Sequence, residues 1–323
     1  MAEKSFPHYQ WLQRNLNTVV PIIALIVIVL AMQSINPAFF SHQGIVTLVY
    51  SMSWFLIAAC GLTFVILMGS FDFSVPSVLK LSALLCGIFL PQLGLGVVPL
   101  ALAVSAIIGI VNGIILTKFN VPSFMATLAT SVLVEGIALI LSRGYIYVVT
   151  DPLFLGLART FIPPGFGLPS IFYWAIGLWL IAIFITLATP FGRAIYAIGG
   201  NLYGAKLAGI NINKVRILTF MLSALYAGIA GVLFMAHKGG GSMAIGQLET
   251  IPLFASVVVG GTALTGGVGG IHRTLIGAIV ITWLDSGLSM LGFDFNIRMI
   301  VFGIVAIIMT ALTIDRRRIK IIK

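Results

Sequence analysis

The sequence predicts an all-α, polytopic membrane protein with about ten transmembrane helices. Hydrophobic residues make up 60% of the 323-residue chain and charged residues only 8%, and the mean hydropathy is +1.15. A soluble domain carries about 25% charged residues, so this chain has too few to cover a water-exposed surface. Its apolar runs are about 20 residues long, which suits spanning helices rather than the ~10-residue alternating strands of a barrel.

Ten apolar segments are the predicted spans, and the eighth is the weakest. It is short and runs into a glycine-rich stretch, so we expect a re-entrant segment or a broken helix that lines a cavity. The first run is too long for a signal peptide and lacks a small-residue cleavage site. The segments are Thr18–Ile35, Val46–Met68, Ser77–Leu93, Val97–Thr117, Pro122–Leu141, Ser170–Ala188, Ile217–Ala236, Ile251–Leu264, Thr274–Leu291 and Ile297–Ile314.

Basic residues decide between the two forms of the eighth segment. With ten crossings and a cytoplasmic N-terminus, 13 Lys and Arg residues lie inside and four lie outside, namely Arg143, Arg159, Lys238 and Arg298. A re-entrant eighth segment gives 8 inside and 9 outside, which the positive-inside rule disfavours. We therefore expect ten crossings with both termini in the cytoplasm.

The remaining composition excludes several classes of protein. The net charge of +10 lies in loops and tails between apolar runs, so it marks orientation in the lipid bilayer and not a nucleic-acid partner. Cys60 and Cys86 lie in apolar stretches, where buried free thiols are expected. The four histidines lack ligand spacing, so no metal site is expected, and no phosphate-loop motif GxxxxGK[ST] occurs.

Few polar residues lie within or beside the predicted spans. They do not form a chain, so we expect them to hold helices together or to cap broken ones, with a coupling-ion role as the alternative. Asp72 or Ser74 is expected to cap the helix that follows, with Pro76 in its first turn. The candidates for the pathway or for helix breaks are Asp72, Ser74, Glu135, Glu249, Gly260, Gly261 and Asp285.

Two further patterns concern the organisation of the chain. VILMGSFDFS at 65–74 is similar to VVVGGTALTG at 257–266, which indicates either a duplicated half, as in many transporters, or chance. The aromatic and proline-rich loop 142–169 is either a lid or docking surface or an irregular solvated loop.

The segment GRAIYAIGGNLYGAKLAGI at 192–210 lies between two long apolar runs and carries Arg193 and Lys206. Charges and freed backbone groups are costly in hydrocarbon. We therefore expect a compact loop on one membrane face, with a turn at Gly199, Gly200 and Asn201 and one short amphipathic helix at roughly Leu202–Ile210.

Five ordered segments carry a resemblance over nearly the whole chain. They are GLTFVILMGSFDFSV, VPSFMATLAT, GRAIYAIGGNLYGAKLAGININKVR, GQLETIPLFASVVVGGTALTGGVGG and the span ending GLSMLGF. The chain resembles the ribose-type permease subunits of ATP-binding-cassette (ABC) importers and, more distantly, the branched-chain amino-acid permeases.

The resemblance implies a non-catalytic subunit of a larger machine. Such subunits pair in the bacterial inner membrane as homo- or heterodimers and receive a monosaccharide from a periplasmic or other extracytoplasmic binding protein. A cytoplasmic ATP-binding subunit holds ATP and Mg²⁺, and this chain binds no cofactor. The implied layout is one permease domain over 1–323, with a cytoplasmic coupling loop at 189–216 and an extracytoplasmic loop at 142–169. The implied coupling residues are Gly192, Arg193, Gly199, Gly200, Asn201, Lys206 and Gly209.

The chain also departs from the pattern of this family. Pro76 follows Ser-Val where a glycine is usual, Asp285 stands where an asparagine is common, and Lys80 is unusual. Gly270-Ile-His272-Arg273 replaces a plainer glycine–threonine entry before the ninth span. Because of these departures, the transported solute could instead be a nucleoside or another small polar molecule. An ion-coupled secondary transporter is the alternative from a different class.

Overall fold

The structure is a computed structural model that describes residues 23, 26–27, 30–35, 37–164, 167–241 and 250–313. Within them the chain is mostly helical, which confirms the prediction of an all-α membrane protein. Five helical stretches in this part are long and apolar enough to cross a membrane. They are His42–Leu67, Val75–Lys118, Ser123–Ser142, Ser170–Ala188 and Ile212–Lys238. Half of the first predicted span, Thr18–Ile35, lies outside the described residues.

The helices follow the apolar runs closely. Ser170–Ala188 is reproduced residue for residue, and the other boundaries shift by a few residues. The elements in chain order are η1 (Pro37–Phe40), α2 (His42–Leu67), α3 (Val75–Leu93), η2 (Gly94–Gly96), α4 (Val97–Lys118), α5 (Ser123–Ser142), β1 (Tyr147–Val148), α6 (Pro152–Arg159), β2 (Phe161–Ile162), β3 (Leu168–Pro169), α7 (Ser170–Ala188), α8 (Pro190–Gly200), α9 (Leu202–Leu207), α10 (Ile212–Lys238), β4 (Gly240–Gly241), α11 (Thr250–Val259), α12 (Ile271–Met290) and α13 (Phe295–Thr313).

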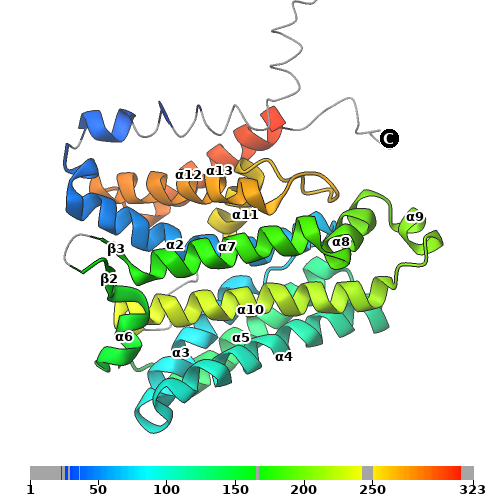
Figure 1. The fold of residues 1–323 in the computed structure, drawn as a ribbon, viewed down its shortest axis with the longest axis horizontal. Helices are drawn as coiled ribbons and strands as arrows, with labels where there is room; N and C mark the ends of the chain where they lie inside the picture. Colours follow the sequence, from blue (N-terminus) through cyan, green and yellow to red (C-terminus); the bar gives the residue numbers. More distant parts are fainter. Residues whose placement is uncertain are drawn as a thin grey trace, which may run out of the picture.

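Helices α2 and α10 form the centre of the bundle; in Figure 1, α10 runs across the middle and α2 passes behind α7. The most apolar window of each is 67% buried, against 22% in α7. Small residues bring the central helices together: a Cβ on Gly109 of α4 would lie 2.4 Å from the carbonyl oxygen of Phe220 on α10. Lipid tails are as apolar as leucine, so this close backbone packing, not apolar burial, holds membrane helices together.

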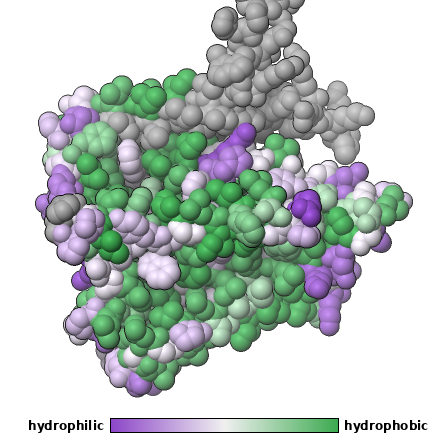
Figure 2. Space-filling model, viewed as in Figure 1, coloured by the Kyte–Doolittle hydropathy of each residue, from purple (hydrophilic) through white to green (hydrophobic). Residues whose placement is uncertain are grey.

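The outer helices leave large apolar side chains uncovered. Val132 and Ile140 on α5 are 71% and 77% exposed. Figure 2 shows hydrophobic side chains over most of the middle of the molecule, with hydrophilic side chains mainly toward the two ends of the helices. This distribution suits a hydrocarbon core flanked by two aqueous faces.

The loop 142–169 contains a capped helix. Asp151 accepts a hydrogen bond from the backbone N–H of Phe154 at 2.9 Å, which starts α6, and the Phe154 ring is fully buried. Arg159 at the end of α6 donates to the carbonyl oxygen of His237 at 3.0 Å. Two short ladders, β1 with β4 and β2 with β3, complete this end of the molecule. The alternative of an irregular loop is therefore wrong for 152–159.

Helices α11 and α12 pack as an antiparallel hairpin. A Cβ on Gly277 would meet the carbonyl oxygen of Ser256, and a Cβ on Gly260 would lie 2.7 Å from that of Arg273. Helix α11 ends at Val259 and not at Leu264, because the chain turns at Gly261 with φ +83°. The 10 described residues of α11 span about 15 Å, half of the ~30 Å hydrocarbon core.

Candidate functional site

The predicted coupling segment folds as two helices rather than one. Thr189 accepts from the backbone N–H of Gly192 at 3.1 Å and starts α8, so Gly199 and Gly200 end a helix and do not form a free turn. Asn201 then accepts from the N–H of Gly204 at 3.0 Å and starts α9. The expected helix Leu202–Ile210 stops at Leu207 because the chain turns at Gly209, whose φ is +77°.

One side of the segment formed by α8 and α9 is exposed. Arg193, Asn201 and Lys206 are exposed, and Tyr203 and Leu207 of α9 are 72% and 73% exposed. Aromatic and aliphatic side chains beside exposed cations are typical of a protein interface. The exposed side of α8 and α9 thus combines cationic, aromatic and aliphatic side chains.

Its other side meets two more segments at glycines, which we call the glycine junction (Gly69, Gly199, Gly266 and Gly267). A Cβ on Gly199 would lie 2.0 Å from the carbonyl oxygen of Leu67, and one on Gly266 would lie 2.6 Å from Cα of Gly69. The N–H of Gly267 donates to the same carbonyl of Leu67 at 2.8 Å. Backbone therefore touches backbone where α8, the end of α2 and the tip of the α11–α12 hairpin converge.

Tyr196 adds a side-chain contact from α8 to the same hairpin. Its hydroxyl donates to the carbonyl oxygen of Gly269 at 3.1 Å. Burial raises the pKa of the Tyr196 phenol above its ordinary value, so the group remains a neutral donor. Tyr196 therefore connects α8 to the tip of the α11–α12 hairpin.

The chain between α2 and α3 is held by a buried polar cluster. Asp72 Oδ1 accepts from the N–H of Ser74 at 3.0 Å and from its hydroxyl at 2.6 Å, and Oδ2 accepts from Ser223 of α10 at 2.9 Å. Asn112 of α4 donates to the Ser74 hydroxyl at 2.9 Å. The Ser74 hydroxyl thus faces Asp72 and does not cap α3, contrary to expectation, while Pro76 does lie in the first turn. Hydrogen bonding of both side-chain oxygens of Asp72 makes burial of this polar group tolerable.

The backbone of this break is held by α5. Ser123 accepts from the N–H of Phe71 and Thr127 from the N–H of Phe73, both at 3.0 Å. The half-buried rings of Phe71 and Phe73 pack against Phe254 of α11, with centroids 6.1 and 4.8 Å away. Sequence reasoning missed Ser123, Thr127 and Ser223. The four-residue spacing of Ser123 and Thr127 in an apolar helix was the available signal.

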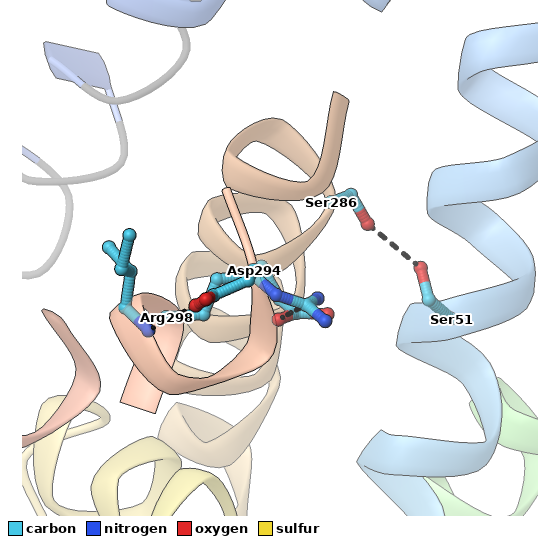
Figure 3. Close-up of polar contacts among 6 residues, drawn as sticks. Ser51, Ser286, Asp294 and Arg298 are labelled. Atoms are coloured by element: carbon cyan, nitrogen blue, oxygen red, sulfur yellow. Dashed lines mark hydrogen bonds and ion pairs between the residues drawn. The ribbon is translucent and has the colours of Figure 1, made fainter. Parts of the chain in front are cut away.

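The other ionisable candidates lie apart and have their own partners. Glu135 of α5 pairs with Lys80 of α3 at 3.2 Å, and Asp285 of α12 pairs with Arg298 of α13 at 2.7 Å. Figure 3 shows Arg298 and Asp294 at the start of α13, and Ser286 of α12 facing Ser51 of α2. The structure therefore joins Asp72 to Ser74 but does not bring Asp72, Glu135 and Asp285 together.

Three of the predicted pathway or helix-break residues lie in or next to helix α11. Gly260 packs on α12 and Gly261 forms the turn after α11, so both serve the hairpin, whereas Glu249 lies outside the described residues. In the described ranges, no group of three or more His, Cys, Asp or Glu side chains could hold a metal ion.

The two similar sequence segments end their helices in the same way. Gly69 and Ser70 donate to the carbonyls of Ile66 and Val65, and Gly261 and Thr262 donate to those of Val258 and Val257. This is the Schellman pattern of helix ends, here with glycine φ of +76° and +83°. The likeness at 65–74 and 257–266 therefore extends to backbone geometry.

Comparison with known proteins gives concordant matches. A family model described as branched-chain amino acid transport system / permease component matches residues 44–310. The ribose import permease protein of Haemophilus influenzae is 33% identical over 300 residues, covering 88% of this chain and 90% of that protein. That of Escherichia coli K12 is 34% identical, covering 92% and 93%. The xylose transport system permease protein of Escherichia coli K12 is 28% identical, covering 93% and 92%. No solved structure gives a significant match.

Proposed function

Because this chain belongs to the family of branched-chain amino acid transport system permease components, we propose that it is the membrane-spanning permease subunit of an ABC importer for a monosaccharide. Its relatives are named as ribose and xylose permeases, which supports a sugar as the solute. The chain itself makes and breaks no bonds. ATP and Mg²⁺ belong to the partner subunit, because this sequence has no phosphate-loop motif.

The glycine junction is the observation that carries this proposal. A permease driven by a separate ATPase needs a surface that receives the motor and a rigid link from it to the solute route. The exposed face of α8 and α9 is the receiving surface, with Arg193 and Lys206 facing outward. The backbone contacts of Gly199 with α2 and the hairpin form the link, since packed backbone moves as a unit.

The proposed topology has ten crossings with both termini in the cytoplasm. The antiparallel hairpin of α11 and α12 supports a chain that descends through α11 and returns through α12. Pairing of β1 with β4 groups 240–241 with the loop 142–169 on the opposite, extracytoplasmic side. The domain is continuous over 1–323, and 189–216 is its cytoplasmic coupling loop.

The proposed partners follow from this arrangement. An extracytoplasmic solute-binding protein delivers the sugar, an ATP-binding subunit docks on α8 and α9, and a second permease copy completes the route in the inner membrane. Among the described residues, Asp72, Glu135 and Asp285 each have separate local partners, which argues against a relay for ion-coupled transport.

Co-purification in mild detergent tests the assignment. We expect the tagged chain to recover an ATP-binding subunit with Walker motifs in stoichiometric amount, and mass spectrometry of the sample will distinguish a homodimer from a heterodimer. Isolation of the chain alone, under conditions that keep a known ABC importer intact, overturns the proposal. Asp72, Glu135 and Asp285 then become the residues to test for ion coupling.

A further inference from the structure

The ion pair between Lys80 and Glu135 has unused hydrogen-bonding capacity. Lys80 Nζ lies 3.2 Å from Glu135 Oε1, and neither side chain makes another polar contact within the described part of the chain. An ammonium group has three donors and a carboxylate about four acceptor sites, so most of them are free. Lipid tails cannot supply the missing partners.

The pair is open on one side only. Lys80 is 2% exposed and Glu135 is 37% exposed, so the lysine is sealed inside the bundle and the carboxylate reaches its surface. Glu135 is the thirteenth residue of the 20-residue helix α5, far from either end. A charge exposed at this depth is costly unless it faces water or a polar ligand.

A polar stripe connects the pair to the helix break. Ser123, Thr127, Ser131 and Glu135 are spaced by four residues and share one face of α5. The stripe begins where Ser123 holds the break at Phe71, and Ser131 is half-buried one turn before Glu135. Thr127 is fully buried and its hydroxyl is bonded to the backbone of the break. A polar solute that moves along α5 can therefore reach Ser123, Ser131 and Glu135 on this face.

We propose that the Lys80–Glu135 pair binds hydroxyl groups of the sugar as it passes along the α5 face. A monosaccharide offers several adjacent donors and acceptors, which match the free N–H groups of Lys80 and the free carboxylate oxygen of Glu135. The inference rests on the proposed function and adds a contact site to it. Lipid or a second copy of the chain against this face are the competing occupants.

Cysteine labelling distinguishes a wet face from a covered one. Leu139 lies one turn after Glu135 on the same face, whereas Leu133 lies on the other side of the exposed surface of α5. Both are exposed, at 56% and 65%, and the native Cys60 and Cys86 are fully buried, so their background is low. In the assembled importer, we expect a charged, membrane-impermeant methanethiosulfonate to label Leu139→Cys about tenfold faster or more than Leu133→Cys. Equal rates, or disulfide cross-linking of Leu139→Cys between two copies without labelling, overturn the proposal.

Uptake by proteoliposomes tests sugar contact itself. With D-ribose and D-xylose as probes at saturating binding protein, Glu135→Gln is expected to lower uptake about tenfold or more, the effect of one lost charged hydrogen bond. A purely structural ion pair can be replaced by apolar residues with little loss. The double variant Lys80→Met/Glu135→Leu therefore stays defective if the pair binds sugar, and its recovery overturns the inference. If the wild-type importer transports neither D-ribose nor D-xylose although Leu139→Cys is labelled as expected, the assignment of a sugar as the solute is wrong. The water-accessible face of α5 is then still supported.

Discussion

Replacing Gly199 by alanine tests whether the glycine junction links the coupling helices to the solute route. The added methyl carbon would lie 2.0 Å from the carbonyl oxygen of Leu67 and 2.5 Å from the nitrogen of Gly267. Both neighbours are backbone atoms, so neither can rotate away. Helix α8 and the end of α2 must instead separate by more than ~1 Å to restore ordinary contacts.

The cost has two components. Overpacking of this kind costs about 1–3 kcal/mol, and weakening of the 2.8 Å hydrogen bond from Gly267 to Leu67 adds about 1 kcal/mol. The total is about 2–4 kcal/mol. If this whole free energy raises the barrier to the transport step in which α8 packs against α2, uptake slows by roughly 30- to 900-fold.

The assay compares uptake with ATP hydrolysis in proteoliposomes that hold the complete importer. Because α8 keeps its exposed docking face, we expect the ATP-binding subunit to remain bound and hydrolysis to stay within about twofold of wild type. Uptake per ATP hydrolysed should fall sharply. The amount of inserted chain is measured first, so that loss of protein is not mistaken for loss of coupling.

Gly200→Ala is the matched control, one residue away. A Cβ at Gly200 meets no atom within 4 Å, so this variant should transport at a rate close to wild type. Equal uptake by Gly199→Ala and Gly200→Ala would refute the proposed link, because the two variants differ in the predicted overlap with α2.

Three further predictions concern the other contacts. Ser223→Ala removes the 2.9 Å hydrogen bond to Asp72 and should destabilise the folded chain by about 1–3 kcal/mol in thermal unfolding, and an unchanged melting temperature would contradict that role. Arg298→Met leaves Asp285 unpaired and should cost at most about 1 kcal/mol, because the Asp285 side chain is 42% exposed; Arg298→Met with Asp285→Asn should recover part of it, and no recovery would argue against the pair. Asp151→Ala removes the cap of α6 and should cost about 1 kcal/mol, detected as faster protease cleavage within 142–169, whereas unchanged cleavage would show that the cap is dispensable.

The main helices were predictable because the bilayer imposes a length on apolar runs. Ser170–Ala188 shows this most clearly, since polar or helix-breaking residues mark both of its ends. Helix α8 was not predicted as a helix. Gly199 and Gly200 indicate a turn by composition, but in the structure Gly199 is small because α2 lies against it, and only the fold reveals that neighbour.

The candidate site was predictable in part. Asp72 stood out because a carboxylate in an apolar chain is rare, yet its partner Ser223 lies 151 residues away, and serines in apolar helices are common. Lys80 and Glu135 were noted separately, and only the packing of α3 against α5 makes them a pair. Hydropathy identifies a costly group, but the fold determines which partner satisfies it.

The matched turns at Gly69 and Gly261 constrain the lengths of two helices jointly. Each residue added to an α-helix rotates the downstream chain by about 100° and advances it by ~1.5 Å. One insertion in α2 before Gly69 would therefore swing Asp72 away from Ser223 and remove Gly69 from beneath Gly266. An insertion in α11 would likewise displace Gly266 from its contact with Gly69. At these two helix ends, natural variants should thus tolerate substitutions of residues other than Gly69 and Gly261 far better than insertions or deletions.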